Sequence, residues 1–251
     1  MKITNKRLNE VFVFVPGLLV GHKIYNLLMV RDFLKTKVKK VYIHARERGM
    51  DLSERADWLV RILDSELDGR KVHLFGHSAG GLDIRLALHR RPDLMKNVVS
   101  LTTCGTPHRG TPIADQYLRA LKSTKIDQML FGSDKAEIIA KQFTWGYLQE
   151  FADTVQTIEE LGGDKVFCLP CSISKKWKTP MINWRGLGTL KIANDSTVTV
   201  FSQTYGKVID YMDVDHKAAT LPFRYGLSWK TYQDVFMKVI ENCEAVERGE
   251  L

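Results

Sequence analysis

The chain has no long hydrophobic segment, no internal repeat and no stretch of low complexity. No run of 18 apolar residues occurs in its 251 residues, so no transmembrane helix is predicted. The apolar stretch 11–15 is broken by Pro16 and Gly17 and is too short for the core of a signal peptide. We therefore expect a cytoplasmic or otherwise intracellular protein. The ordinary globular composition excludes collagen, coiled coils and disordered chains.

Cysteine is scarce, with only 4 residues. Cys168 and Cys171 have the spacing of a metal-binding pair, but no second pair and no nearby histidine completes a zinc set. We therefore expect the cysteines to be structural. No metal ion and no cofactor is predicted.

Acidic residues are fewer than basic ones, 29 against 37, which gives a net charge of +8. Residues 1–50 carry the whole excess, including the run Lys35, Lys37, Lys39 and Lys40. Such a run contacts an anionic lipid surface or a phosphate polymer, or it is simply a solvated helix end. Because no nucleic-acid-binding motif is present, no nucleic-acid partner is predicted.

Short β-rich runs alternate with helical stretches along the chain. Most of these runs are continuously apolar, as strands buried on both faces are. The alternation predicts a single α/β domain over residues 1–251, with a sheet of about six mostly parallel strands flanked by helices. The predicted strands are 11–15, 38–43, 72–75, 98–102, 166–169 and 208–211.

The helices between these strands are of two kinds, ordinary crossovers and one insert. A crossover helix is predicted over 53–67, with Ser53 as its N-cap. The insert is predicted over 114–163, which is longer than a single crossover needs. Apolar residues recur in it at helical spacing, among them Ile138, Ile139, Phe143, Tyr147 and Phe151.

Residues 71–85, KVHLFGHSAGGLDIR, place a serine between a strand and a helix. This context turns the bare GxSxG match at 76–80 into a nucleophile elbow. Glycine is needed two residues before and after Ser78 because a side chain there would collide with neighbouring strands or the helix. Gly81 lets the helix approach the sheet closely. Ser78 is the predicted nucleophile, and the amide of Ala79 faces the developing anion.

The second donor of an oxyanion hole is expected in the loop after the first strand. That loop, residues 15–21, reads VPGLLVG. Its Gly17 permits a sharp turn that presents the amide of Leu18. The predicted oxyanion hole is therefore formed by Leu18 and Ala79.

A serine nucleophile needs a general base and an acid that orients it. In this fold the order along the chain is Ser, acid, His. His108 and His216 follow the elbow helix, and only His216 also follows an acid loop and a final strand. Asp195, in a turn 21 residues earlier, is the predicted acid. Asp213 and Asp215 remain rivals by proximity, although an immediate neighbour cannot readily face its own histidine's ring.

Four segments together resemble the bacterial triacylglycerol lipases of the Pseudomonas and Burkholderia type, within the α/β-hydrolase superfamily. These segments are VPGLLVG, KVHLFGHSAGGLDIR, TTCGTPHRGTPIAD and NDSTVTVFSQTYGKVIDYMDVDH, and they span most of 11–220 apart from the insert. The resemblance implies Ser78 as nucleophile, Asp195 as acid and His216 as base. It also implies that the insert is a lid, which covers the acyl pocket until an oil surface draws it open.

Three features depart from that family. The oxyanion loop has Pro16 where the family has histidine, which keeps the turn but loses a side-chain hydrogen bond. The family binds calcium through an Asp two residues and a Gln six residues after the catalytic histidine, where this chain has Ala218 and Pro222. Calcium is therefore expected to be absent. The family's secretion signal is also not visible.

The sequence thus predicts a serine carboxylic-ester hydrolase, a lipase or long-chain esterase that works through an acyl-enzyme on a lipid or ester substrate. An acyltransferase or a phospholipase built on the same site is the alternative, because only the acceptor or head group would differ. A non-catalytic interaction protein is disfavoured, since such a protein has no physical reason to keep all three groups of the triad.

Overall fold

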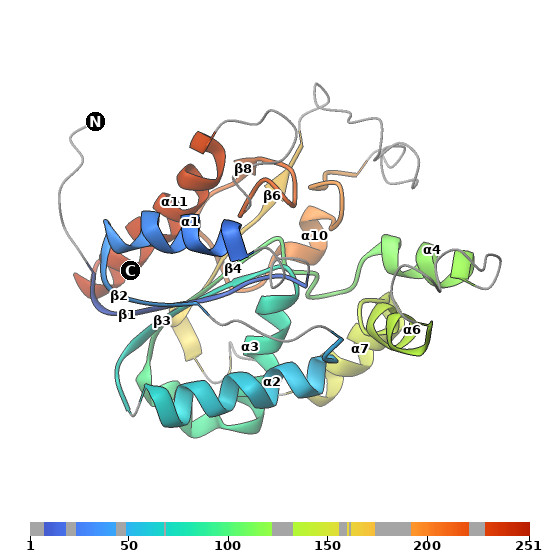
Figure 1. Cartoon of the computed structure of the whole chain (residues 1–251), viewed down its shortest axis with the longest axis horizontal. Helices are drawn as coiled ribbons and strands as arrows, with labels where there is room; N and C mark the ends of the chain where they lie inside the picture. The colour runs from blue at the N-terminus through green and yellow to red at the C-terminus, as the bar shows by residue number, and fades with distance from the viewer. Residues whose placement is uncertain are drawn as a thin grey trace.

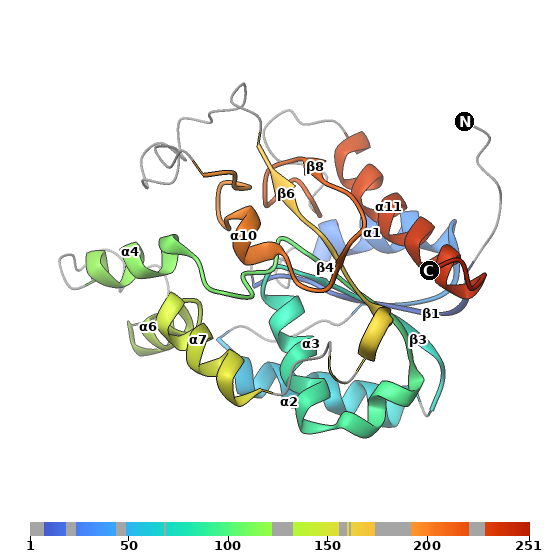
Figure 2. The ribbon, with the colours of Figure 1, turned by 180° about the vertical axis from the view of Figure 1, so that it is seen from behind.

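The computed structural model has a six-stranded parallel sheet with helices on both faces (Figures 1 and 2). It describes residues 8–18, 24–43, 49–67, 69–121, 133–155, 160, 162–173, 192–220 and 229–251. The strand order is β2-β1-β3-β4-β5-β7. The fold class predicted from the sequence is confirmed. The strands are β1 (Leu8–Val15), β2 (Val38–Ile43), β3 (Val72–His77), β4 (Val98–Cys104), β5 (Val166–Leu169) and β7 (Lys207–Val208).

Two apolar clusters bury the two faces of this sheet. On one face Phe14 packs with Leu34 and Phe236, and on the other Val13 packs with Leu59 and Ile84. Successive residues of a strand point to opposite faces, so a strand that is covered on both sides must be continuously apolar. The helices on the first face are α1 (Ile24–Lys35) and α11 (Trp229–Glu247), and those on the second are α2 (Leu52–Arg61) and α3 (Ala79–Arg90).

The chain changes direction across the sheet at β1, which lies between β2 and β3. The loops that leave β1 and β3 therefore lie side by side at the carboxyl edge of the sheet. Open α/β sheets bind ligands at this edge, where the strand order reverses. The fold thus places the elbow at Ser78 and the loop at Gly17 together.

Among the described residues, three α-helices lie between β4 and β5, where the insert is predicted. They extend beyond one end of the sheet in Figures 1 and 2. Phe143, Leu148 and Phe151 of this segment pack against Ala79 and Leu82 of α3. The helices are α4 (Pro112–Leu121), α6 (Ser133–Lys141) and α7 (Trp145–Thr154).

The sixth predicted strand, 208–211, is wrong in its extent. The main sheet gains only β7, Lys207–Val208, and a separate short pair forms between β6 (Cys171–Ser172) and β8 (Met212–Asp213). Pro170 interrupts the neighbouring strand, because it has no N–H to donate. Its carbonyl accepts instead from the amide of Met212, at 2.9 Å. The pairing therefore resumes beyond the proline, where Cys171 pairs with Met212.

The predicted N-cap Ser53 is also wrong, because α2 begins one residue earlier. Asp51 caps it: its carboxylate accepts from the amide of Glu54 at 2.9 Å, and the Glu54 carboxylate accepts from the amide of Asp51 at 2.8 Å. The Ser53 hydroxyl accepts from Arg90 instead. The predicted helix also continues as the π-helix η1 (Ile62–Glu66) rather than as a uniform α-helix to residue 67.

The remaining elements are short. Among the helices in the described ranges, none is both long enough and apolar enough to cross a bilayer. All four cysteines are buried thiols outside any disulfide, in agreement with a structural role. The short elements are η2 (Pro92–Asn97), η3 (Gly163–Lys165) and α10 (Val200–Gln203).

Candidate active site

Ser78 occupies a sharp turn between β3 and α3. Its φ of 53° and ψ of −127° are rare for a residue with a side chain, and such strain persists only where the surroundings enforce it. Its amide donates to the carbonyl of Cys104 at the end of β4, at 2.9 Å. The side chain is half-buried. The turn therefore presents the hydroxyl at the carboxyl edge of the sheet.

The glycines around Ser78 are required by close backbone contacts. A Cβ on Gly76 would lie 2.7 Å from the Cα of Gly81, and one on Gly80 would lie 2.0 Å from the carbonyl oxygen of Val15. A Cβ on Gly81 itself would lie 2.2 Å from Oγ1 of Thr106. The collisions expected from the motif are thus present at both flanks.

Ser78, His216 and Asp195 form one hydrogen-bonded chain. Oγ of Ser78 lies 2.9 Å from Nε2 of His216, and Nδ1 of His216 lies 2.7 Å from Oδ2 of Asp195. Because a carboxylate only accepts, Nδ1 carries the proton and Nε2 is free to accept from the serine. Asp195 is fully buried and His216 is 6% exposed. This geometry suits a nucleophile, a general base and an orienting acid.

The structure distinguishes Asp195 from its two rivals. Its other oxygen, Oδ1, accepts from the amides of Thr197 and Val198 at 3.0 and 2.7 Å. These bonds fix the carboxylate that faces His216.

The rival carboxylates have other surroundings. Asp215 accepts from the hydroxyl of Ser196 at 2.5 Å and from the amide of Lys217 at 3.0 Å. Asp213 is exposed on β8. The structure therefore brings Asp195, rather than either neighbour of the histidine, to the imidazole.

The loop after β1 passes directly beside the serine. A Cβ on Gly17 would lie 2.8 Å from the Cβ of Ser78 and 3.3 Å from its Oγ. Leu18 follows in this loop and is half-buried, while Ala79 is buried as the first residue of α3. The two residues predicted to form the oxyanion hole therefore lie on the two segments that meet at Ser78.

The GTPHRG segment after β4 contacts both the catalytic histidine of the candidate site and the helix α10. Gly105 has a φ of +61°, and a Cβ there would lie 3.1 Å from Nδ1 of His216. Arg109 donates to the carbonyls of Phe201 and Thr204, at 2.9 and 2.6 Å. The segment thus leaves room for the imidazole and fixes the chain that follows Asp195.

His108, the other histidine that follows the elbow helix, is not at the serine. It is buried, its ring stacks on Tyr205 at 4.5 Å, and its Nε2 lies 3.1 Å from the hydroxyl of Thr103. Burial, followed by the charges of Arg85 and Arg109, lowers the pKa of His108 well below its usual value. It is therefore a neutral core residue.

The sequence analysis assigned no role to His77 or Thr220. His77 is buried beside the ring of His216, with a centroid distance of 5.0 Å, and it contacts the hydroxyl of Thr220. The available signal for His77 was its place inside the GHSAG motif, as a large polar residue beside Ser78. No sequence pattern indicated Thr220.

The expected loss of the calcium site concerns two positions. Ala218 is buried and offers no side-chain oxygen, and Pro222 lies outside the described residues. Within the described ranges, no three His, Cys, Asp or Glu side chains form a group that could hold a metal ion. The absence of calcium stays a prediction.

Sequence comparison finds curated relatives that are triacylglycerol lipases, whereas no family model matches the chain. The chain is 28% identical over 183 residues to triacylglycerol lipase 2 of Saccharomyces cerevisiae. This alignment covers 67% of this chain and 53% of that protein. The chain is 49% identical over 53 residues to a triacylglycerol lipase of Burkholderia plantarii, which covers 21% of this chain and 14% of the relative. The chain thus spans about half the length of the yeast relative and less of the bacterial one.

Comparison with solved structures identifies the fold. The Bacillus licheniformis lipase BlEst2 in its mature form superimposes with a TM-score of 0.67 at 21% identity, over 92% of this chain and 91% of the lipase. At this identity the likeness concerns the fold alone. Together with the sheet order and the elbow, it shows the α/β-hydrolase fold.

Proposed function

Because the chain has the α/β-hydrolase fold and resembles triacylglycerol lipases in sequence, we propose that it is a serine carboxylic-ester hydrolase, a lipase or long-chain esterase. The observation that carries this proposal is the continuous chain of hydrogen bonds from Ser78 through His216 to Asp195. The strained turn at Ser78 supports it, since such strain is concentrated at functional sites.

In the proposed reaction, Oγ of Ser78 attacks the acyl carbonyl while Nε2 of His216 takes its proton. Asp195 holds the imidazole in the required tautomer and stabilises the imidazolium. The amides of Leu18 and Ala79 donate to the oxyanion of the tetrahedral intermediate. His216 then protonates the departing alcohol, and water, activated by the same histidine, releases the acid from the acyl-enzyme.

The nucleophile is tested by comparing two serines of the same region. Ser78→Ala should lower turnover of p-nitrophenyl esters by about 10⁶, the scale seen when a triad serine is removed. Ser196→Ala is the matched control, because its hydroxyl bonds to Asp215 and not to His216. A Ser78→Ala variant that kept a tenth of the activity would exclude the proposal.

The acyl chain and head group are tested on the same protein. Esters with acyl chains from two to sixteen carbons, emulsified triglyceride and phospholipid provide the comparison. A maximum at long chains and hydrolysis of the emulsion would support a lipase. Activity confined to short soluble esters would leave an esterase, and preferential release of fatty acid from phospholipid would support the phospholipase alternative.

We also propose that the insert of α4, α6 and α7 is a lid. Phe143 and Phe151 are buried against Ala79 and Leu82, at the start of the helix that follows Ser78. Opening would expose these rings, and an apolar interface or a bound acyl chain would offset that exposure.

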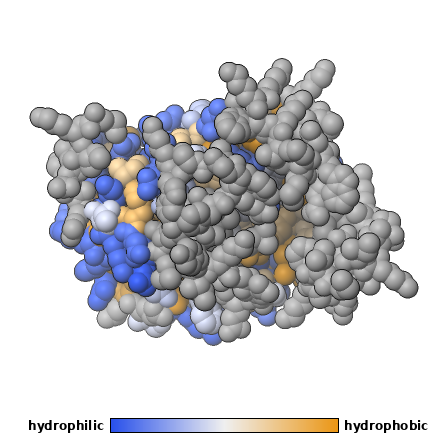
Figure 3. Space-filling view, turned by 45° about the horizontal axis from the view of Figure 1, so that its top comes forward, coloured by the Kyte–Doolittle hydropathy of each residue, from blue (hydrophilic) through white to orange (hydrophobic). Residues whose placement is uncertain are grey.

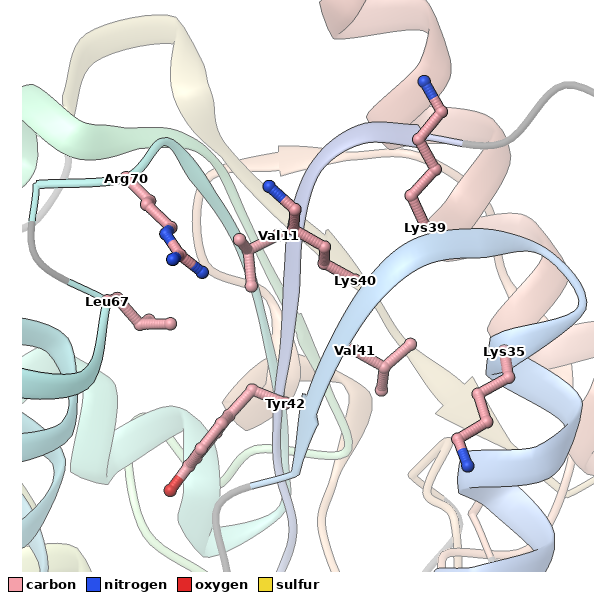
Figure 4. Close-up of a pocket in the computed structure, with 8 residues that line it drawn as sticks. All are labelled: Val11, Lys35, Lys39, Lys40, Val41, Tyr42, Leu67 and Arg70. Atoms are coloured by element: carbon pink, nitrogen blue, oxygen red, sulfur yellow. The ribbon is translucent and has the colours of Figure 1, made fainter.

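We propose further that the protein makes a peripheral contact with an anionic lipid surface, through a basic groove. This groove has a volume of about 410 Å³ and combines four cations with an apolar lining (Figure 4). Lys35 lies 4.0 Å from a carboxylate oxygen of Asp32, and Lys39 donates to the amide oxygen of Asn9. Lys40 and Arg70 form no ion pair with a described residue. The groove is lined by Lys35, Lys39, Lys40 and Arg70 with Val11, Val41, Tyr42 and Leu67.

The basic groove lies at the end of the sheet opposite Ser78. Val11 and Lys40 are paired near the starts of β1 and β2, whereas Ser78 follows the carboxyl end of β3. Six strand residues correspond to about 20 Å. On the left of Figure 3, hydrophilic and hydrophobic residues lie side by side. The contact would therefore hold the protein at a surface without delivering substrate to Ser78.

Vesicle sedimentation tests the groove. Lys39→Gln with Lys40→Gln should weaken binding to vesicles containing anionic lipid by about 30-fold at low salt, since each lysine near such a surface contributes about 1 kcal/mol. Lys141→Gln with Lys207→Gln removes the same charge from exposed positions elsewhere and should leave binding unchanged. If both double variants lost vesicle binding equally, the binding would depend on net charge and not on the basic groove.

A further inference from the structure

His77 connects the nucleophile to the loop that carries His216. It is the last residue of β3, directly before Ser78, and it is 3% exposed. Its Nε2 lies 2.9 Å from the backbone carbonyl oxygen of His216, and its Nδ1 lies 3.2 Å from Oγ1 of Thr220. One imidazole therefore contacts the loop at two points, four residues apart.

The partners of His77 define its tautomer. A carbonyl oxygen only accepts, so Nε2 carries the proton, and Nδ1 then accepts from the hydroxyl of Thr220. Burial, followed by the charge of His216, lowers the pKa of His77 well below its usual value. The ring is thus neutral. This matters because its centroid is 5.0 Å from that of His216, which becomes a cation during the proposed reaction.

Three hydrogen bonds hold His216 through its amide, its Nδ1 and its carbonyl, and the bond from His77 is the third. The amide of His216 donates to the carbonyl of Asp195 at 2.8 Å, and its Nδ1 donates to the carboxylate of the same residue. These two bonds relate the histidine to the acid but not to the serine. The bond from His77 to the carbonyl of His216 adds a link between the backbone of the base and the strand that precedes the serine, because His77 and Ser78 are adjacent in the chain.

We propose that His77 is a positioning residue: it donates from Nε2 to the backbone of His216, accepts from Thr220, and so sets the distance between the general base and Ser78. The inference rests on the proposed function. Thr220 acts through His77 by fixing the tautomer that can donate.

The test compares two buried histidines of the same strand. His73 also lies on β3 and is fully buried, but it bonds to Ser100 and Glu247, away from the site. His77→Leu and His73→Leu should both lower the melting temperature. Only His77→Leu should lower kcat, by about 10- to 100-fold, because a small misplacement of the base is costly in rate. KM should stay within about twofold, since substrate contacts remain.

Rescue and a second probe distinguish positioning from stability. His77→Gln places a donor near the position of Nε2 and should recover most of kcat. The rate at which a fluorophosphonate labels Ser78 should follow kcat across the variants, and it needs no ester turnover. Equal kcat losses in the His73 and His77 leucine variants, or no gain from glutamine, would overturn the proposal.

Thr220 provides a variant of smaller structural effect, in case His77→Leu does not fold. Thr220→Val removes the hydroxyl and keeps the shape, whereas Thr220→Ser keeps the hydroxyl. The valine variant should lose kcat and the serine variant should retain it. Equal activity of the two would exclude the role of Thr220 in fixing the tautomer, and with it the proposed positioning.

The pH profile is a further readout, and the titratable group that faces His77 among the described residues is His216, from the loop after β8. With His77 neutral, the acid limb of kcat/KM should have the slope of a single proton, and His77→Gln should share it. A two-proton slope in the parent protein that becomes single in His77→Gln would contradict the neutral assignment. If Ser78→Ala stays active the proposed function fails, whereas an inactive Ser78→Ala with an unimpaired His77→Leu defeats only this inference.

Discussion

The carboxyl edge of the sheet and the helical insert are built in different ways, although they touch. At the edge, backbone approaches backbone: a Cβ on Gly80 would lie 2.0 Å from the carbonyl oxygen of Val15. The insert packs through large side chains, with Phe143 and Phe151 against α3. A Cβ on Gly146, in α7, would meet nothing within 4 Å.

The difference follows from what each region must do. Proposed catalysis needs three groups held within hydrogen-bond reach, and close backbone contacts leave little freedom to move. Apolar side-chain packing has no such directional demand, so a helix can separate and repack at moderate cost. The edge therefore suits chemistry, and the insert suits a cover that opens.

After the replacement of Ser78, the largest expected effect concerns the acid at the edge. Asp195→Asn should lower kcat by about 10⁴, because an amide facing Nδ1 favours the wrong imidazole tautomer. Asp215→Asn is the control, since its carboxylate bonds to Ser196 and Lys217. Steady-state kinetics of both variants decide the matter. Greater damage from Asp215→Asn or Asp213→Asn would show that another carboxylate orients His216.

The glycine contacts provide the next test, now on stability. Gly80→Ala should lower the free energy of unfolding by ~3 kcal/mol or more, because the backbone of β1 cannot yield to a methyl group. Gly146→Ala should leave it unchanged or raise it by up to ~1 kcal/mol through helix propensity. Urea denaturation of the two variants measures the contrast. Similar free energies for both would mean that the edge is no tighter than the insert.

Acid should destabilise the core that contains the edge. The pKa values of His77 and His108 are lowered well below 6.5 by burial, so below pH 6.5 the unfolded chain binds more protons than the folded one. Stability should therefore fall as the pH drops below 6.5, by on the order of 1 kcal/mol for each histidine at pH 5.5. Residues 114–163 contain no histidine, so the insert contributes no histidine to this acid sensitivity.

Urea denaturation at pH 7.5 and 5.5 measures this dependence. His108→Gln should be less stable than the parent protein at pH 7.5, because it loses the stacked ring. Its loss between the two pH values should nevertheless be smaller, by on the order of 1 kcal/mol. An unchanged pH difference would show that His108 is not a source of the acid sensitivity.

The smallest expected effect concerns the insert as a lid. The initial rate on a medium-chain ester should rise sharply once the ester exceeds its solubility and forms droplets. Phe143→Ser with Phe151→Ser should flatten that rise while sparing short soluble esters. Ile138→Ser with Trp145→Ser is the control, because both side chains are already half exposed. A smooth saturation curve in the parent protein, unaffected by these changes, would make the insert ordinary core.

Some features of this protein are readable from local sequence because local geometry causes them. A strand, a serine between small residues and a helix predict the turn at Ser78, since other residues do not fit it. Continuous apolar runs predict a sheet covered on both faces. The cap of α2 was equally readable, because Asp51 and Glu54 have the spacing of a capping box, although the prediction chose Ser53.

Other features depend on segments that meet only in three dimensions. Chain order favoured Asp195, but proximity in sequence left Asp213 and Asp215 as rivals. In the folded structure only Asp195 of these three is hydrogen-bonded to the imidazole. The bond between His77 and the carbonyl of His216 joins residues 139 positions apart. No periodicity or spacing encodes such a contact. The sequence by itself thus determined which groups the site has and the turn that exposes the nucleophile, because short-range sterics act within a few residues. Only the tertiary structure decided which carboxylate and which second histidine hold the base, because those distances depend on how segments from different strands pack at one edge.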